Sequence, residues 1–294
     1  MAAIDDFDDD ARADRFADNE DNKAIDTLFI VAQHDGFKWA DECRYVKDLC
    51  RATRAENGLW SAMTRVHYGP AERTLLMYEA PFGPAERTLL MYEAHCGHLE
   101  RVRWLLARGA PRDACDEMGQ TALHWACARG HIDIVRELIA ADSGVNIRSH
   151  FGWAPLHYAG HRGRTDIVRL LIAVGADINI ASNDGWTPLH LSCCNGHIDT
   201  ARALLEAGAA VDIANNDGWT PLLFACSNDQ ANIVLTLIAA GADFNLADER
   251  GRTPLDIAIH NNHESITNAL IEAGATTGPN AEDWSDDGPD AYEP

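Results

Sequence analysis

The chain lacks the sequence features of membrane, secreted and nucleotide-binding proteins. It contains no apolar run of about 18 residues, which is roughly the length that a membrane-spanning helix needs. The N-terminus, MAAIDDFDDD, is acidic, whereas secretory and transit peptides carry basic residues. No Asn-x-Ser/Thr sequon and no CxxC, GxxxxGK[ST], GxGxxG or GxSxG motif occurs. These absences predict a non-enzyme without cofactor or membrane contact, located in the cytoplasm or the nucleus.

Basic residues are also scarce, and this argues against binding to nucleic acid. The formal net charge is −22, while phosphate binding needs a basic surface. Of the eight cysteines, three are regularly spaced, because the interval from Cys127 to Cys193 is twice that from Cys193 to Cys226. Neighbouring packed helices lie about 8–10 Å apart, and a disulfide needs Cα atoms within about 7 Å. We therefore expect free, buried thiols in a reducing compartment.

What the chain does contain is a 33-residue period, repeated six times without insertion or deletion. Glycine occurs nine residues after the opening residue in the first four units, and Leu-Leu or Leu-Ile follows at seventeen and eighteen. A strict period of this length indicates a stacked array, in which each unit is stable only beside its neighbours. The opening residues are Thr88, Thr121, Ala154, Thr187, Thr220 and Thr253.

Each unit reads as a turn, a helix, a loop and a second helix. In the fourth unit Asn183-Asp184-Gly185 favours a turn, because these residues tolerate left-handed geometry. Thr187 can cap the helix that follows, and Pro188 fits its first turn. Gly196 ends that helix, and apolar residues at helical spacing then predict a second one over Ile198–Ala207.

The motif TPLHxAxxxGHxxIVxLLxxGADxN resembles the ankyrin repeat. The matching segments are TALHWACARGH (Thr121–His131), APLHYAGHRGR (Ala154–Arg164), TPLHLSCCNGH (Thr187–His197) and TPLLFACSNDQ (Thr220–Gln230), with looser matches at Thr88–His98 and Arg252–His263. The resemblance implies an all-α solenoid of stacked helix-turn-helix units, joined by fingers that are β-turns or hairpins. It also implies a protein-binding, non-catalytic role.

We divide the chain into five parts. Residues 1–23 hold nine acidic and three basic residues, and residues 276–294 hold six acidic residues and no basic one, so both ends are expected to be disordered tails. Residues 24–53 keep the nine-residue spacing from Thr27 and are expected to form a divergent ankyrin-like unit. Residues 54–85 form an irregular connection, and residues 86–275 form the six repeats.

The connection contains a perfect internal copy. GPAERTLLMYEA occurs at Gly69–Ala80 and again at Gly83–Ala94, an offset of fourteen positions that does not fit the 33-residue period. It is either a recent tandem duplication or an error in the gene model, and we expect the second copy to be the packed one. Within that copy Glu93 stands where the other units have Ala or Ser. A fully buried carboxylate is costly, so we expect looser packing on this side of the first unit.

The histidines recur with the period, which predicts structural roles rather than catalysis. His124, His157 and His190 occupy the TPLH position, where the resemblance implies hydrogen bonds between loops and helices. His98, His131, His197 and His263 occupy the GH position. His95/His98, with Cys96 nearby, and His260/His263 are spaced like metal ligands, but nothing in the sequence completes a four-ligand set, so we predict no metal site.

The resemblance places a protein-binding surface at the turn tips and on the exposed side of each first helix. The candidate residues in this chain are Met118, Arg129, Phe151, Trp153, Arg162, Asp184, Trp186, Asn195, Asp217, Trp219, Asn228, Arg250 and Arg252. The three tryptophans form a ladder that serves either as interface hot spots or as packing that stiffens the turns. Trp125, Tyr158 and Phe224, four residues after an opening residue, are expected in the core.

Two functions follow from this surface, and a third belongs to another class. The first is a monomeric interaction module or scaffold that binds an unidentified partner protein on the concave face. The second is a reader of basic or methylated peptides through an exposed tryptophan ladder, since an indole ring attracts cations. The third is an enzyme or a regulatory subunit of one.

Overall fold

The computed structural model describes residues 88–279, and within this range the chain forms twelve α-helices and no strands. Expectations about residues 1–87 and 280–294 lie outside the described residues. The helices are α5 (Leu89–Cys96), α6 (Leu99–Ala107), α7 (Ala122–Arg129), α8 (Ile132–Ala140), α9 (Pro155–His161), α10 (Thr165–Ala173), α11 (Pro188–Cys194), α12 (Ile198–Glu206), α13 (Pro221–Ser227), α14 (Ala231–Ala239), α15 (Pro254–His260) and α16 (Glu264–Ala273).

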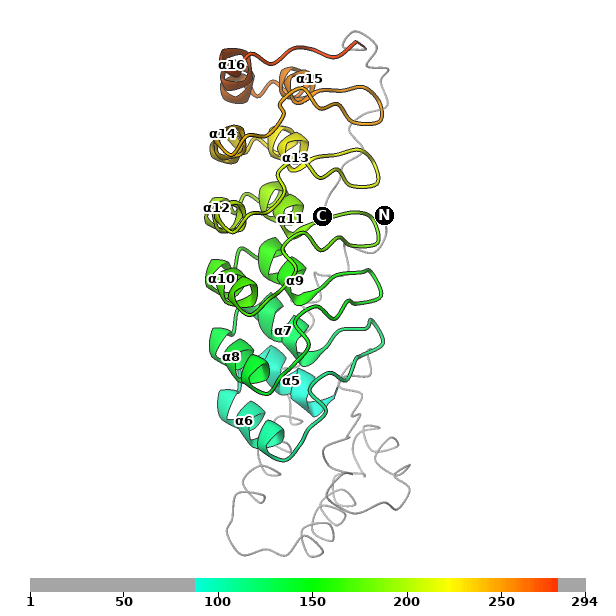
Figure 1. Cartoon of the computed structure of the whole chain (residues 1–294), viewed down its shortest axis with the longest axis vertical. Helices are drawn as coiled ribbons and strands as arrows, with labels where there is room; N and C mark the ends of the chain where they lie inside the picture. The colour runs from blue at the N-terminus through cyan, green and yellow to red at the C-terminus, as the bar shows by residue number, and fades with distance from the viewer. Residues whose placement is uncertain (1–87, 280–294) are drawn as a thin grey trace, which may run out of the picture. The chain divides into compact units, whose positions relative to one another are not determined.

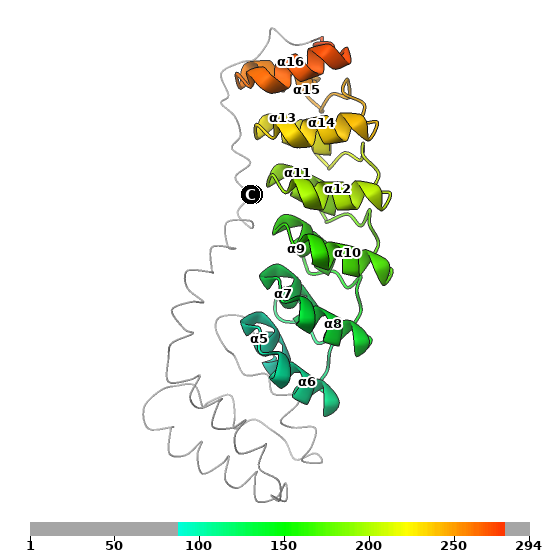
Figure 2. The ribbon, with the colours of Figure 1, turned by 90° about the vertical axis from the view of Figure 1, so that its left-hand side faces the viewer.

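The helices pair into six units that stack in chain order (Figure 1). Unit one consists of α5 and α6, and unit six of α15 and α16. The odd-numbered inner helices form one row and the even-numbered outer helices form another, as Figure 2 shows from the side. Loops between consecutive units project beyond the inner row on the side away from the outer helices (Figure 1). The predicted all-α solenoid is confirmed.

Each inner helix begins where the sequence pattern predicts. Thr187 accepts a hydrogen bond from the backbone N–H of His190, and Thr253 accepts one from Asp256. This satisfies a donor that the first turn of a helix leaves without an intrahelical partner. The opening residue of unit three, Ala154, has no hydroxyl group. There the Nδ1 atom of His157 lies 3.0 Å from the Ala154 nitrogen and accepts its hydrogen bond.

A left-handed residue separates the inner from the outer helix in every unit. At this position Gly130 has φ 83°, and Asp229 and Asn262 have φ 54° and 58°. Glycine adopts such values without strain, and Asp and Asn are the side chains that tolerate them best. A Cβ atom on Gly130 would also meet the Arg164 side chain of the next unit at 2.7 Å. The position therefore constrains both the turn and the spacing between units.

The core is continuous because each unit contributes the same buried positions. The leucine seventeen residues after each opening residue, from Leu105 through Leu270, lies on an outer helix and is at most 1% exposed. Small residues of the inner helices, among them Ala126, are fully buried between neighbouring units. Cys127, Cys193 and Cys226 are buried free thiols, as predicted, and burial raises their pKa values. Small side chains here let the inner helices approach closely.

Candidate functional site

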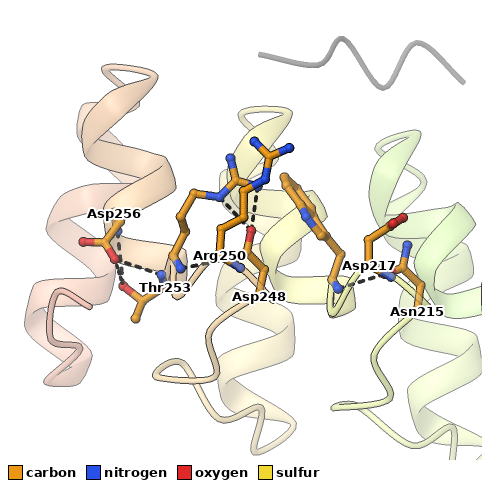
Figure 3. Close-up of polar contacts among 8 residues, drawn as sticks. Asn215, Asp217, Asp248, Arg250, Thr253 and Asp256 are labelled. Carbon is orange, nitrogen blue, oxygen red and sulfur yellow. Dashed lines mark hydrogen bonds and ion pairs between the residues drawn. The ribbon is translucent and has the colours of Figure 1, made fainter. Parts of the chain in front are cut away.

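The loops between units form five fingers, which cover residues 110–120, 143–153, 176–186, 209–219 and 242–252. Each finger is closed by a backbone hydrogen bond across its tip, such as the 2.8 Å bond from Asn215 N to Trp219 O. The first residue of that bond also caps the tip with its side chain. Asn215 Oδ1 accepts from the N–H groups of Asp217 and Trp219, and Asp248 Oδ1 accepts from those of Arg250 and Arg252 (Figure 3). The tips therefore have a fixed backbone conformation.

Neighbouring fingers are also bonded to one another. His150 N donates to Met118 O at 2.8 Å, Asn183 N to Phe151 O at 3.0 Å, and Asn216 N to Asp184 O at 3.0 Å. Amide side chains add further bonds, as from Asn183 Nδ2 to His150 O at 2.7 Å. Four consecutive fingers therefore form one connected edge. Between the fourth and fifth fingers, the described residues include no equivalent bond from Glu249 N to Asp217 O.

The TPLH histidines join each inner helix to the finger that follows it. The Nε2 atoms of His124, His157 and His190 lie 3.0–3.1 Å from the carbonyl oxygens of Trp153, Trp186 and Trp219. All three rings are fully buried, and desolvation lowers their pKa values to about 4. They are therefore neutral at physiological pH, and the predicted structural role is confirmed.

The GH histidines likewise contact the preceding unit. The ring nitrogens of His131, His197 and His263 lie 2.8–3.0 Å from carbonyl oxygens of His95, His161 and Cys226. His98, the first of the series, contacts Glu93 instead. Within residues 88–279 no group of three His, Cys, Asp or Glu side chains is arranged to hold a metal ion.

Units one, five and six depart from the histidine pattern, and unit one has Met91 at that position. Leu223 takes the histidine position of unit five and has no polar atom to donate to Arg252 O. Asp256 takes the position in unit six, where its Oδ2 atom accepts from Thr253 N, Thr253 Oγ1 and Gly278 N at 2.8–2.9 Å (Figure 3 shows the bonds to Thr253). Its Oδ1 atom is buried without a hydrogen-bond partner. A carboxylate accepts but cannot donate, so it does not suit the carbonyl of a further finger.

Residues 276–279, which we assigned to the acidic C-terminal tail, lie in the described part of the chain. Thr276 N donates to Asn245 Oδ1 at 2.9 Å, and Thr253 Oγ1 lies 3.1 Å from Thr276 O. Gly278 reaches Asp256 as described above. These contacts place the first residues after α16 against the last finger and α15. The described contacts of the array therefore continue past residue 275 as far as Gly278.

The tryptophan ladder is mostly buried, which bears on the two roles that the sequence left open for it. Trp153 is 8% and Trp219 6% exposed, and only Trp186 is partly exposed. The ring centroids of Trp186 and Trp219 lie 4.4 and 4.9 Å from that of Phe224. An indole next to a turn is held there by the apolar surface it buries against the inner helices. Of the two roles that the sequence allowed, the structure fits packing.

The remaining predicted residues line the fingers and the ends of the inner helices. Phe224 and Tyr158 are buried as predicted, whereas Trp125 is only partly buried and donates from Nε1 to Asp116 Oδ2 at 3.1 Å. Arg252 is half-buried, pairs with Asp248 at 2.6 Å and lies 5.4 Å from the Trp219 ring. The other candidates are either exposed, namely Met118, Asp184, Asp217, Asn228 and Arg250, or half-buried, namely Arg129, Phe151, Arg162 and Asn195.

Polar contacts connect the ends of successive inner helices. Arg129 Nη2 lies 2.8 Å from His95 Nε2, and Asn195 Nδ2 lies 3.1 Å from His161 Nδ1. Asn228 Nδ2 donates to Cys194 O at 3.0 Å. His95 was not among the predicted surface residues. Its position, seven residues after Thr88 and equivalent to that of His161, could have identified it.

Glu93 contradicts the expectation of looser packing in unit one, because its side chain is fully buried. Its Oε2 atom lies 2.6 Å from His98 Nδ1, and its Oε1 atom lies 3.5 Å from Arg101 Nη1 without a hydrogen bond. Burial raises the pKa of Glu93 to about 6, and the contact with His98 partly opposes this rise. The carboxyl is tolerated because two basic side chains of its own unit lie beside it.

Comparison with known families agrees with this architecture. A family model described as ankyrin repeats, three copies, matches residues 60–149, 134–215 and 207–283, which together span most of the chain. The chain belongs to the ankyrin repeat family. The first match begins at residue 60, inside the segment that we expected to be an irregular connection. No curated protein matches the chain.

Membership in this family gives the fingers and inner helices a general role. Ankyrin repeats are generally protein–protein interaction modules. Within the described part of the chain, every helix is too short or too polar to span a membrane. The surface formed by the fingers and the inner helices is therefore the candidate functional site of this ankyrin repeat protein.

Proposed function

We propose that the protein is a non-catalytic scaffold whose ankyrin array binds a partner protein on the concave face formed by the fingers and inner helices. The bonded edge of the fingers supports this proposal most directly. It holds exposed side chains such as Met118, Asp184 and Asp217 on a backbone fixed by hydrogen bonds from finger to finger. A preorganised surface loses little conformational freedom on binding, so more of the contact energy contributes to affinity.

A reader of basic or methylated peptides has less support. An aromatic cage needs ring faces open to the ligand. Two of the three indoles, Trp153 and Trp219, are buried, and the Trp219 ring already lies near the Arg252 guanidinium. Only Trp186 remains partly exposed. A single open ring is a weak basis for recognising a methylated cation.

The proposal is tested by affinity purification with two matched triple variants. The finger variant carries Met118→Ser, Asp184→Ala and Asp217→Ala, and the control carries Leu235→Ser, Asp166→Ala and Asp199→Ala on the outer helices. All six residues are exposed, and each triple removes one apolar and two acidic side chains. Circular dichroism first establishes that both are folded.

We expect the wild type and the outer-helix control to retain a partner protein. The finger variant should lose this protein. Equal recovery by all three proteins would move the binding site away from the fingers. Loss with the outer-helix control alone would place the site on the opposite face and would overturn the proposal.

A further inference from the structure

The finger side of the array carries its charges in separate zones. The arginines at the ends of the inner helices, Arg129 and Arg162, belong to units two and three. The equivalent positions of units four and five are Asn195 and Asn228. The whole chain has a net charge of −22. Positively charged side chains on a candidate binding face therefore differ from the acidic character of the chain as a whole.

A contact places Arg129 on the concave side rather than on the outer surface, and Arg162 is the C-cap residue of the inner helix α9. Arg129 reaches the inner helix of unit one, where it bonds to His95. The His95 ring lies 5.1 Å from that of Trp125, and Trp125 in turn donates to Asp116 in the first finger. In unit three the His161 ring, next to Arg162, lies 5.7 Å from the finger residue Trp153. Arg129 therefore lies between a finger and an inner helix, and Arg162 directly follows the residue that makes this contact in unit three.

The electrostatic surroundings of His161 agree with a positive zone. Burial lowers the pKa of His161 to about 4, and the charges of Arg162 and His197 lower it further. His161 is therefore neutral at physiological pH, and the arginines carry the charge. A guanidinium stays protonated at any physiological pH and presents a fork of donors that matches a carboxylate.

The finger tips also differ in chemistry between the first two fingers and the next two. Met118 and Phe151, three residues before an opening residue, give the first two tips an apolar side chain, and Met118 is 36% exposed. The two tips are joined by the bond from His150 N to Met118 O. At the same position the next two fingers present the exposed carboxylates Asp184 and Asp217. The first tip also carries the exposed Glu117 beside Met118. Within four units the surface thus changes from a mixed zone with two arginines and apolar tips to one with carboxylates and amides.

We propose that the zone formed by Arg129, Arg162, Met118 and Phe151 binds an acidic segment of a partner protein that also carries apolar side chains. Carboxylates of the segment pair with the two guanidinium groups, and an apolar side chain packs on the Met118 and Phe151 tips. The segment continues with neutral or basic residues over Asp184 and Asp217, since acidic residues would be repelled there. This inference rests on the proposed function and adds the chemistry and the orientation of the partner.

The outer helices supply a matched control. Arg136 and Arg169 also occupy equivalent positions of units two and three, and both are exposed. They lie beside acidic side chains, Arg136 3.9 Å from Asp133 and Arg169 3.6 Å from Glu206. Exposed pairs of this kind contribute little to stability. Replacing Arg136 and Arg169 removes the same charge as replacing Arg129 and Arg162, but from the opposite face.

The test uses three labelled peptides, EELEELEE, QQLQQLQQ and KKLKKLKK, and fluorescence anisotropy on the full chain. We expect the wild type to bind the acidic peptide most tightly, and Arg129→Gln/Arg162→Gln to weaken this binding by about tenfold or more. Arg136→Gln/Arg169→Gln should change it by less than about twofold. Equal weakening by both pairs, or tighter binding of the basic or neutral peptide to the wild type, would overturn the proposal.

A second measurement separates this inference from the proposed function. The partner captured by the wild type is tested against the finger triple variant and against Arg129→Gln/Arg162→Gln. Loss of the partner with both variants supports the acidic segment. If the partner is lost with the finger triple but retained by the arginine pair, the scaffold function stands and the acidic segment is wrong. If both variants retain it, both proposals fail.

Discussion

His157 and Trp186 connect two units through a single part-buried hydrogen bond, from the Nε2 of His157 to the carbonyl oxygen of Trp186 at 3.0 Å. The other ring nitrogen accepts from Ala154 N at 3.0 Å. One side chain therefore bonds to the buried start of a helix at Ala154 and to the base of a finger at Trp186. The same arrangement recurs at His124 and His190.

Replacing His157 by leucine tests the value of this bond, because unit five has leucine there naturally. His157→Leu leaves Trp186 O and Ala154 N without their partners, and we expect a loss of roughly 1–3 kcal/mol in the free energy of unfolding. Urea denaturation followed by circular dichroism measures it. His150→Leu, at an exposed finger tip, serves as the control and should leave the midpoint unchanged. An equal shift for both variants would contradict the structural role.

The same histidines predict how stability depends on pH. Their pKa values of about 4 in the folded protein lie below the ordinary value of 6.5, so unfolding allows them to take up protons. Their contribution is fully present above pH 6.5 and is lost as the pH falls towards 4, by roughly 2 kcal/mol per histidine at pH 4.5. Urea midpoints at pH 7.5, 5.5 and 4.5 should fall in that order, and less steeply in His157→Leu. A flat profile would refute this prediction.

The raised pKa of Glu93 predicts a pH dependence of stability in unit one that is opposite in sign to that of the histidines. Its pKa of about 6 lies above the ordinary 4.5, so the folded state favours the protonated carboxyl. That contribution is present below pH 4.5 and is lost as the pH rises through 6. Glu93→Gln removes the titration, and at pH 8 we expect it to be more stable than the wild type by about 1–2 kcal/mol. At pH 4.5 the two midpoints should be similar. A less stable glutamine variant at pH 8 would show that the ionised pair with His98 and Arg101 stabilises unit one.

The close packing of Gly278 predicts that residues 276–279 stabilise unit six. A Cβ atom on Gly278 would overlap the carbonyl oxygen of Gly251 and lie 2.9 Å from Asp256 Oδ2. Gly278→Ala should therefore displace residues 276–279 and raise hydrogen exchange in α15 and α16 by about tenfold, with little change in α7 to α12. Thr277→Ala, one residue earlier and exposed, is the control. Unchanged exchange in α15 and α16 would mean that this segment does not stabilise unit six.

The 33-residue period allowed the helices and turns to be predicted from the sequence, but not the contacts that bury individual side chains. Thr187, Pro188 and Gly196 act locally, so helix starts and turns followed directly from residue type and spacing. The burial of Trp153 and Trp219 did not, because it depends on the rings of Tyr158 and Phe224 on the inner helices beside them. Glu93 was misjudged for the same reason, since its partners His98 and Arg101 lie on a different turn of the chain.

The surface was only partly predictable. Offsets from each opening residue placed Arg129 and Arg162 on the concave side, but the bond from Arg129 to His95 spans two units and cannot be read from either alone. Unit six differs again, because within residues 88–279 no further finger accepts from its inner helix. There Asp256 binds the backbone of Gly278 instead, and this could not be inferred from a pattern that assumes a next unit.

Leu223 bears on how the array responds to mechanical force. If the described stack is pulled along its length, tension passes between units through the bonds from His124, His157 and His190 and through the bonded finger tips. At the joint between units five and six, Leu223 donates nothing, and within the described residues the last finger lacks the backbone bond that joins the tips of its neighbours. Among the joints between units two and six, rupture under load should therefore begin at this one, with unit six released as one 33-residue step while units two to five stay assembled.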